Sequence, residues 1–124
     1  MKIAIIILSI TILFTGSITS ATELNAVELQ QYCSEVDKGS IGNEFDKELA
    51  QYCKGYMAAF FDSMIVIEQI TAKKDFCIPR MLPKTQNNLI LNSWISQNTE
   101  IASKTTAAVA LYAAFKTAFP CEKK

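Results

Sequence analysis

The sequence contains no histidine among its 124 residues. Histidine is the most common general base and a frequent metal ligand, so its absence removes the usual Ser–His and Cys–His catalytic pairs. The chain also has no net charge, because 12 basic residues balance 12 acidic ones. A nucleic-acid-binding domain needs a basic face, so this balance argues against such a partner. The length, with half of the residues hydrophobic, predicts one small domain rather than a disordered chain.

The first 21 residues are predicted to be a signal peptide. Lys2 is the only charged residue before Glu23, and residues 3–14 form an apolar run. A membrane-spanning helix needs about 20 apolar residues, so a retained anchor is the weaker interpretation and we expect no stable membrane insertion. Small residues follow the run, and we place cleavage after Ala21, with Ser20 as the alternative. The remaining residues, 22–124, lose Lys2 and carry a net charge of −1.

The four cysteines, Cys33, Cys53, Cys77 and Cys121, all lie in the predicted exported domain. Outside the cytosol, an even number of cysteines in a small domain indicates disulfides, here two. A zinc site would need closely spaced cysteines or a histidine partner, and a reactive thiol would need an activating base. The sequence provides neither, so we expect no metal and no cofactor.

Apolar residues recur at helical spacing in four segments, and this periodicity predicts an all-α fold. The predicted helices span residues 23–36, 44–72, 84–97 and 100–118. The second contains no proline and would be about 40 Å long, so we expect it to be the central element of a small four-helix bundle. The apolar stripe of the last helix is expected to face the core and consists of Ile101, Ala108, Val109, Tyr112, Phe115 and Phe119.

Helix geometry narrows the three ways of pairing four cysteines. Cys53 lies inside the long helix and Cys77 lies just beyond its end, so nearly 30 Å of helical rise separates them. A disulfide needs Cα atoms within about 7 Å, which excludes that pair. Consecutive antiparallel helices bring Cys33 beside Cys53 and return Cys121 towards Cys77. We therefore predict the disulfides Cys33–Cys53 and Cys77–Cys121.

The sequence offers no catalytic constellation. The carboxylates of the first half lie at predicted turns, helix starts and solvent faces, and the glycines form no phosphate-binding loop. Gly55 stands in the middle of the long helix, where glycine costs about 1 kcal/mol relative to alanine, so we expect close helix packing there. The aromatic residues Tyr56 and Trp94 are predicted core positions, with a role as binding anchors as the alternative.

Several short motifs, taken in order, resemble the Rap/Tai family of type VI secretion immunity proteins. The motifs are Cys53-Lys54-Gly55-Tyr56, Phe76-Cys77-Ile78-Pro79, Gln86 and Phe119-Pro120-Cys121. The resemblance covers residues 30–121 and assigns structural roles to Gly55, Tyr56, Pro79, Gln86 and Pro120. In this family a threonine often caps the helix that contains Gln86, and Pro83 takes its place here.

The resemblance implies a periplasmic protein that binds a cell-wall amidase delivered by the type VI secretion system and blocks it sterically. It also implies a homodimer and protection of the producing cell and its siblings. We predict that the effector contacts the exposed face of helix 84–97 and the polar turn after it, which consists of Ser96, Gln97, Asn98, Thr99 and Glu100.

Two other classes remain as alternatives at this stage. A periplasmic acid-stress chaperone is also small, helical and disulfide-bonded, and it would dissociate and expose apolar surface at low pH. A small hydrolase would need catalytic groups that the missing histidine and the paired cysteines do not provide. Two or more free thiols in the unfolded protein would reopen the enzyme class.

Overall fold

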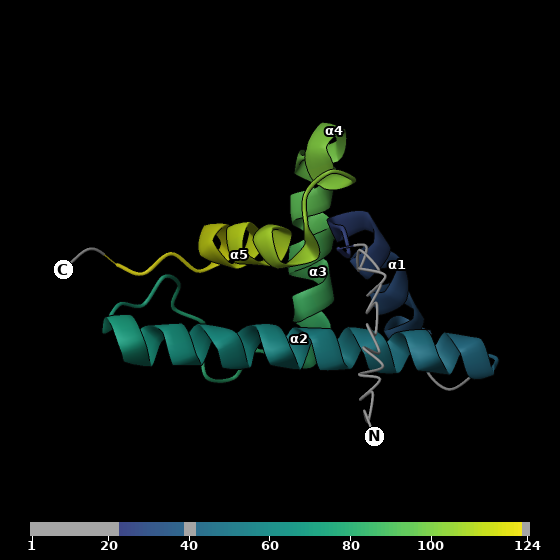
Figure 1. Cartoon of the computed structure of the whole chain (residues 1–124), viewed down its shortest axis with the longest axis horizontal. Coiled ribbons are helices and arrows are strands. Elements are labelled where there is room, and N and C mark those ends of the chain that lie inside the picture. The colour runs from purple at the N-terminus through teal and green to yellow at the C-terminus, as the bar shows by residue number, and fades with distance from the viewer. Residues whose placement is uncertain (1–22, 39–41, 123–124) are drawn as a thin grey trace, which may run out of the picture.

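Helices joined by loops make up the residues that the computed structural model describes, 23–38 and 42–122 (Figure 1). Within them lie the helices α1 (Ala26–Asp37), α2 (Glu44–Thr71), α3 (Lys84–Gln97), α4 (Thr99–Ala102) and α5 (Ala107–Ala118). The only β-type pairing in this part of the chain is an isolated bridge between Asn25 and Thr106. The predicted all-α class is therefore confirmed. The predicted signal peptide, residues 1–21, lies outside the described residues.

The first two helices begin where side chains replace missing backbone partners. At α1, the Asn25 side chain accepts from the backbone N–H of Glu28, and the Glu28 carboxylate accepts from the Asn25 N–H. Asn43 and Asp46 make the same reciprocal pair at α2. These capping boxes satisfy backbone N–H groups that have no partner within the helix. Helix α1 begins at Ala26, three residues later than predicted, because Asn25 is its cap.

The predicted last helix, residues 100–118, is wrong in one respect, because the structure divides it. A four-residue helix α4 ends at Ala102, and α5 begins at Ala107. The break is stabilised by contacts that are remote in sequence, since the N–H of Ala107 donates to the Leu24 carbonyl at 2.8 Å. Thr106 then caps α5 by accepting from the Val109 N–H. Hydroxyl residues favour such caps over a continuous helix.

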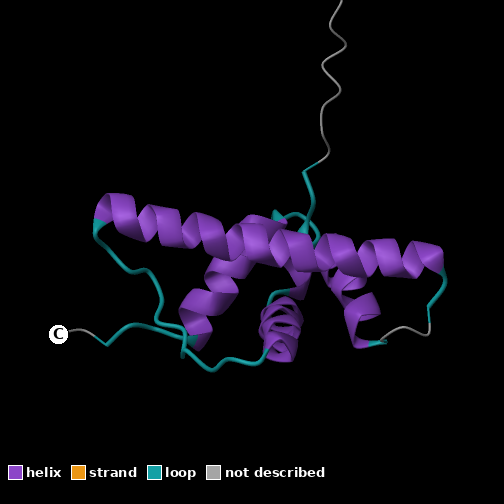
Figure 2. Ribbon diagram, turned by 90° about the horizontal axis from the view of Figure 1, so that it is seen from below, coloured by secondary structure: helices purple, strands orange, loops and turns teal. Residues whose placement is uncertain are grey.

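Helix α2 runs along one edge of the molecule, and α1, α3 and α5 lie together on one side of it (Figure 2). Helix α3 stands steeply across α2, whereas α5 runs along it (Figure 1). The fully buried core consists mainly of Leu29, Leu91, Leu111 and Phe115. Phe61 of α2 meets Phe115 of α5 edge to face, with the ring centres 5.0 Å apart. Large aromatic side chains therefore join the second half of α2 to the rest of the core.

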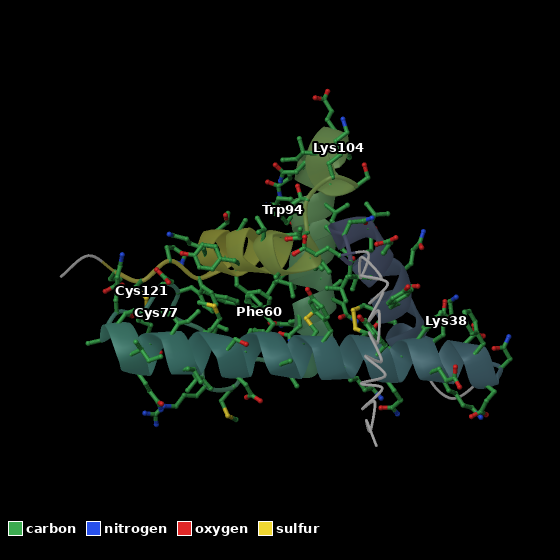
Figure 3. All side chains as sticks on the ribbon, in the orientation of Figure 1. Lys38, Phe60, Cys77, Trp94, Lys104 and Cys121 are labelled. Carbon is green, nitrogen blue, oxygen red and sulfur yellow. A yellow bond between two sulfur atoms is a disulfide. The ribbon has the colours of Figure 1, made fainter. Side chains whose placement is uncertain are left out.

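Both predicted disulfides are confirmed, with Cα–Cα distances of 5.1 Å for Cys33–Cys53 and 5.0 Å for Cys77–Cys121. The first joins α1 to α2 inside the core, where both cysteines are only 2% exposed. The second ties the chain after α5 to the chain after α2, at the far end of α2 (Figure 3). A hydrogen bond of 2.8 Å from the Cys77 N–H to the Phe119 carbonyl reinforces it. The long helix is thus fixed in its first half and just beyond its C-terminal end.

The two disulfides are expected to react with a reductant in a fixed order. Cys77 is exposed and Cys121 is half-buried, whereas Cys33 and Cys53 lie in the core. Thiolate attack requires access to sulfur, so dithiothreitol opens Cys77–Cys121 first in the native protein. Alkylation followed by peptide mass spectrometry measures the order. Labelling of Cys33 and Cys53 before Cys77 and Cys121 would contradict the predicted order of reduction. The control is reduction and labelling in denaturant, where all four cysteines react.

Candidate functional site

The predicted effector-binding residues lie at one extremity of the molecule. Ser96 and Gln97 end α3, Asn98 links the two helices, and Thr99 and Glu100 begin α4. All five are exposed except the half-buried Asn98. Helix α4 projects beyond the other helices on the side away from α2 (Figure 1), and Lys104 marks its outer end (Figure 3). We call residues 96–104 the α3–α4 tip.

The α3–α4 tip is held by its own hydrogen bonds. The expected polar turn is reduced to one non-helical residue, Asn98, with φ −129° and ψ 37°. Its side-chain amide donates to the Trp94 carbonyl at 2.8 Å, and its carbonyl accepts from Ile101 and Ala102 at 3.1 and 3.0 Å. Gln97 donates to the Ser93 hydroxyl at 3.0 Å. These bonds fix the direction in which the tip projects.

Ile101 is the exposed apolar residue of the tip, and its predicted place in the core is wrong. The predicted stripe put Ile101 and Val109 against the core, but their side chains are 51% and 58% exposed. For Ile101 the cause is the break between α4 and α5, which removes it from the helical phase of the buried Phe115. Val109 lies on α5 itself, six residues before Phe115 and so about 120° around the helix from it. Ala102 takes the buried position instead, at 1% exposure. Only the three-dimensional contact between residues 24–26 and 105–107 reveals this.

The exposed face of α3 continues from the tip as an open groove against α5. The groove is lined by Leu89, Ser93, Trp94 and Gln97 of α3 and by residues of α5 such as Thr117. Gln97 belongs to both the groove and the tip and donates a hydrogen bond to Ser93 of the groove, so the two regions predicted to contact an effector form one continuous surface. Trp94 itself is half-buried and packs against the core, as predicted.

The remaining motif residues lie close to a helix end or to the second disulfide. Pro79 lies two residues after Cys77, and Pro120 lies directly before Cys121. Both prolines are exposed and lie in loops. Gln86 lies exposed in the first turn of α3, and its N–H donates to the Pro83 carbonyl at 2.9 Å. Pro83 has no side-chain group that caps α3. The capping role of the usual threonine is therefore absent here.

Gly55 does not make the close helix contact that the sequence analysis expects. A Cβ atom on Gly55 would have no heavy atom of the described chain within 4 Å, if the two adjacent residues and the nearby backbone of the same helix are left aside. Gly55 is exposed on α2, whereas the adjacent Tyr56 is half-buried and packs against the core. Tyr56 also stacks on Tyr52, with ring centres 6.3 Å apart.

Electrostatics around the described surface are mild. The ion pairs join residues close in sequence: Lys47 and Glu44 are both exposed and 3.7 Å apart, whereas Lys38 lies 2.7 Å from Glu35, whose side chain is only 12% exposed. Burial raises the pKa of the Tyr56 phenol, and nearby Tyr52 and Glu23 add to the shift, while a hydrogen bond with the Ala108 backbone opposes it. Hydrogen bonding to Glu35 and to Tyr112 raises the pKa of Lys38 and Lys116 respectively.

No cluster of three metal-ligating side chains occurs within the described ranges. No helix within these ranges is long and apolar enough to cross a membrane.

Tyr56 is expected to make stability fall at alkaline pH. Its pKa in the folded state lies above the ordinary value of 10.0, so the folded state holds the proton more tightly than the unfolded state. The resulting stability is fully present below about pH 10 and is lost as the pH rises through the folded pKa. Urea unfolding of Tyr56→Phe should show a weaker loss between about pH 9 and pH 11 than the parent chain. An equal loss in both proteins would contradict this role.

A family model described as Rap1a immunity proteins matches residues 25–121. No curated protein and no solved structure matches the chain. The match begins at Asn25, the cap of α1, and ends at Cys121 of the second disulfide, so it spans every helix of the fold. The chain belongs to the Rap1a immunity protein family.

Proposed function

We propose that this protein acts in the periplasm and binds and sterically inhibits a peptidoglycan amidase of the type VI secretion system. It thereby protects the producing cell and its siblings, and it has no catalytic activity of its own. Family membership supports the immunity role. The amidase and the periplasm follow from the resemblance, the predicted signal peptide and the two disulfides.

The projecting α3–α4 tip is the observation that carries the proposed mechanism. Substrate clefts of enzymes are concave, so a steric inhibitor needs a convex element that enters the cleft. The tip is convex in this sense, because α4 extends beyond the remaining helices (Figure 1). Asn98 holds it through hydrogen bonds on both sides. An element that is already ordered loses little conformational entropy on binding, and this favours tight inhibition.

The side chains of the tip match the usual composition of a binding surface. Ile101 supplies exposed apolar area, and the exposed residues Glu100 and Lys104 flank it with opposite charges. Interfaces commonly combine a desolvated apolar centre with a polar rim. The adjoining face of α3, with Leu89 and Gln97, adds to the contact area. A stable complex buries about 1,200–2,000 Å² of accessible surface in total.

Substitutions at the tip should weaken effector binding without unfolding the protein. The probe is the product of the neighbouring open reading frame, which the proposal expects to be a type VI amidase effector, and calorimetry gives the dissociation constant. Ile101→Asp, and separately the pair Glu100→Lys with Gln97→Ala, should each weaken binding at least about 10-fold, because charge replaces an apolar contact or reverses a rim charge.

Met81→Asp is the matched control, because Met81 is 90% exposed and lies in the loop between α2 and α3. Its affinity for the amidase should equal that of the parent chain. Unchanged affinity in both tip variants would contradict the proposed contact surface, and no binding by the parent chain would contradict the amidase as the partner.

The mature protein is expected to begin at Thr22. Processing by signal peptidase after Ala21 would remove residues 1–21 on export. Intact mass measurement of the protein extracted from the periplasm tests this, with the cytoplasmic fraction as the control. A periplasmic protein that retains residues 1–21 would contradict the assignment of a cleaved signal peptide.

We also propose that two copies of the chain associate as a homodimer. The described structure is a single chain, and its surface carries large apolar side chains that the core does not cover.

A further inference from the structure

The starts of α1 and α5 are joined by two hydrogen bonds. The N–H of Ala26 donates to the Thr105 carbonyl at 2.9 Å, and the N–H of Ala107 donates to the Leu24 carbonyl at 2.8 Å. Ala26 and Ala107 are the first residues of their helices, and both are fully buried. The two short segments that make these bonds are called the cap clamp here and comprise residues 24–26 and 105–107.

Each helix start in the cap clamp supplies a donor that its own helix cannot satisfy. The first N–H groups of an α-helix have no partner within the helix, and a buried N–H without a partner is unfavourable. In the cap clamp, the first N–H of each helix finds a carbonyl on the opposite segment. The two cap residues, Asn25 and Thr106, are extended and lie opposite each other as an antiparallel bridge. The starts of α1 and α5 therefore satisfy each other.

The cap clamp also holds the segment that returns from the α3–α4 tip. Figure 1 shows this segment descending from α4 to the start of α5. Thr105 makes two connections, because its carbonyl accepts from Ala26 and its hydroxyl donates to the Ile101 carbonyl at 2.9 Å. The N–H of Lys104 donates to the same carbonyl at 2.9 Å. The exposed apolar residue of the tip is thus connected to the start of α1 through a single residue.

Helix α4 is too short to keep its orientation without such attachments. Isolated helices shorter than about 12 residues are marginal in water, because the first turn costs more entropy than one hydrogen bond returns. Helix α4 has four residues and one buried side chain, that of Ala102. Asn98 fixes its beginning through the bond to the Trp94 carbonyl, and the cap clamp fixes its end.

We propose that the cap clamp is a positioning element for inhibition, which holds the α3–α4 tip in the orientation that enters the effector. This inference rests on the proposed function, in which the tip makes the contact. Every residue of the clamp is buried or half-buried, so the clamp acts through the tip and not by touching the effector. A tip released from the clamp has the competent orientation for only part of the time, and the apparent dissociation constant rises in proportion.

Proline at the first position of α5 opens the clamp with little harm to the helix. Ala107→Pro removes the donating N–H and places a ring carbon between residue 107 and the Leu24 carbonyl. Proline suits this position because the helix makes no use of that N–H and because Thr106 before it is extended, with φ −63° and ψ 147°. In hydrogen exchange of the protein alone, the amides of residues 101–104 should exchange about 10-fold faster than in the parent chain.

Two further readouts distinguish positioning from general support of the fold. Exchange in residues 53–64 of α2 should change less than about threefold, because the Cys33–Cys53 disulfide and the contact of Phe61 with Phe115 hold α2 independently of the clamp. The dissociation constant of the effector, measured by calorimetry, should rise about 10-fold in Ala107→Pro.

Two control variants isolate the lost hydrogen bond. Ala107→Gly keeps the N–H and removes only the side chain. Glu44→Pro places proline at the first position of α2, which follows the Asn43 cap and lies outside the clamp. Both variants should keep the exchange of residues 101–104 and the affinity for the effector within about threefold of the parent chain.

Thr105 provides a test that leaves the clamp closed, for the case that Ala107→Pro does not fold. Thr105→Val removes the hydroxyl that bonds to the Ile101 carbonyl, and Thr105→Ser keeps it. Exchange of residues 101–104 should be about threefold faster in the valine variant than in the serine variant. Equal exchange in the two variants would overturn the connection between the clamp and the tip.

The remaining outcomes separate this inference from the proposed function. Unchanged exchange of residues 101–104 in folded Ala107→Pro would overturn the hold of the clamp on the tip. An equal acceleration in the tip and in α2, or a loosened tip with unchanged affinity, would overturn the positioning role. No binding by the parent chain would overturn the proposed partner, whereas exchange in the free protein decides separately whether the clamp orders the tip.

Discussion

The length of α2 is the constraint on which the rest of the structure depends. A helix of 28 residues is about 42 Å long, more than the remaining 12- and 14-residue helices can cover individually. The fold therefore fixes α2 at separate points. The Cys33–Cys53 disulfide joins its first half to α1, and the aromatic contacts of Phe61 with Phe115 join its second half to α5. The face opposite these contacts has no covering element within the described residues.

This arrangement separates two surfaces. Because α3 crosses α2 steeply, its far end and α4 project away from the long helix (Figure 1). An inhibitor benefits from such a geometry, since a projecting tip can enter a cleft while the opposite face is occupied by another molecule. The proposed function assigns the α3–α4 tip to the effector and leaves the outer face of α2 outside that contact. Each surface is then accessible without rearrangement of the fold.

Local sequence patterns were sufficient for much of the fold. The bounds of α2 and α3 follow from helical periodicity, from the Asn43 cap and from Pro83, and the disulfide pairing follows from helix length. The break between α4 and α5 was missed because the backbone bond from Ala107 to Leu24 links residues far apart in sequence. That break also explains why exposed Ile101 was assigned to the core. Gly55 indicates close packing from sequence alone, yet the structure shows open space there within the described residues.

Backbone amide hydrogen exchange, measured on the protein alone and with the proposed amidase effector bound, tests the central claim most directly. The account predicts slower exchange on binding in residues 94–104, where the tip enters the enzyme, and unchanged exchange in residues 52–70 of α2. Slower exchange along α2, with residues 94–104 unaffected, would contradict the inhibitory role of the tip.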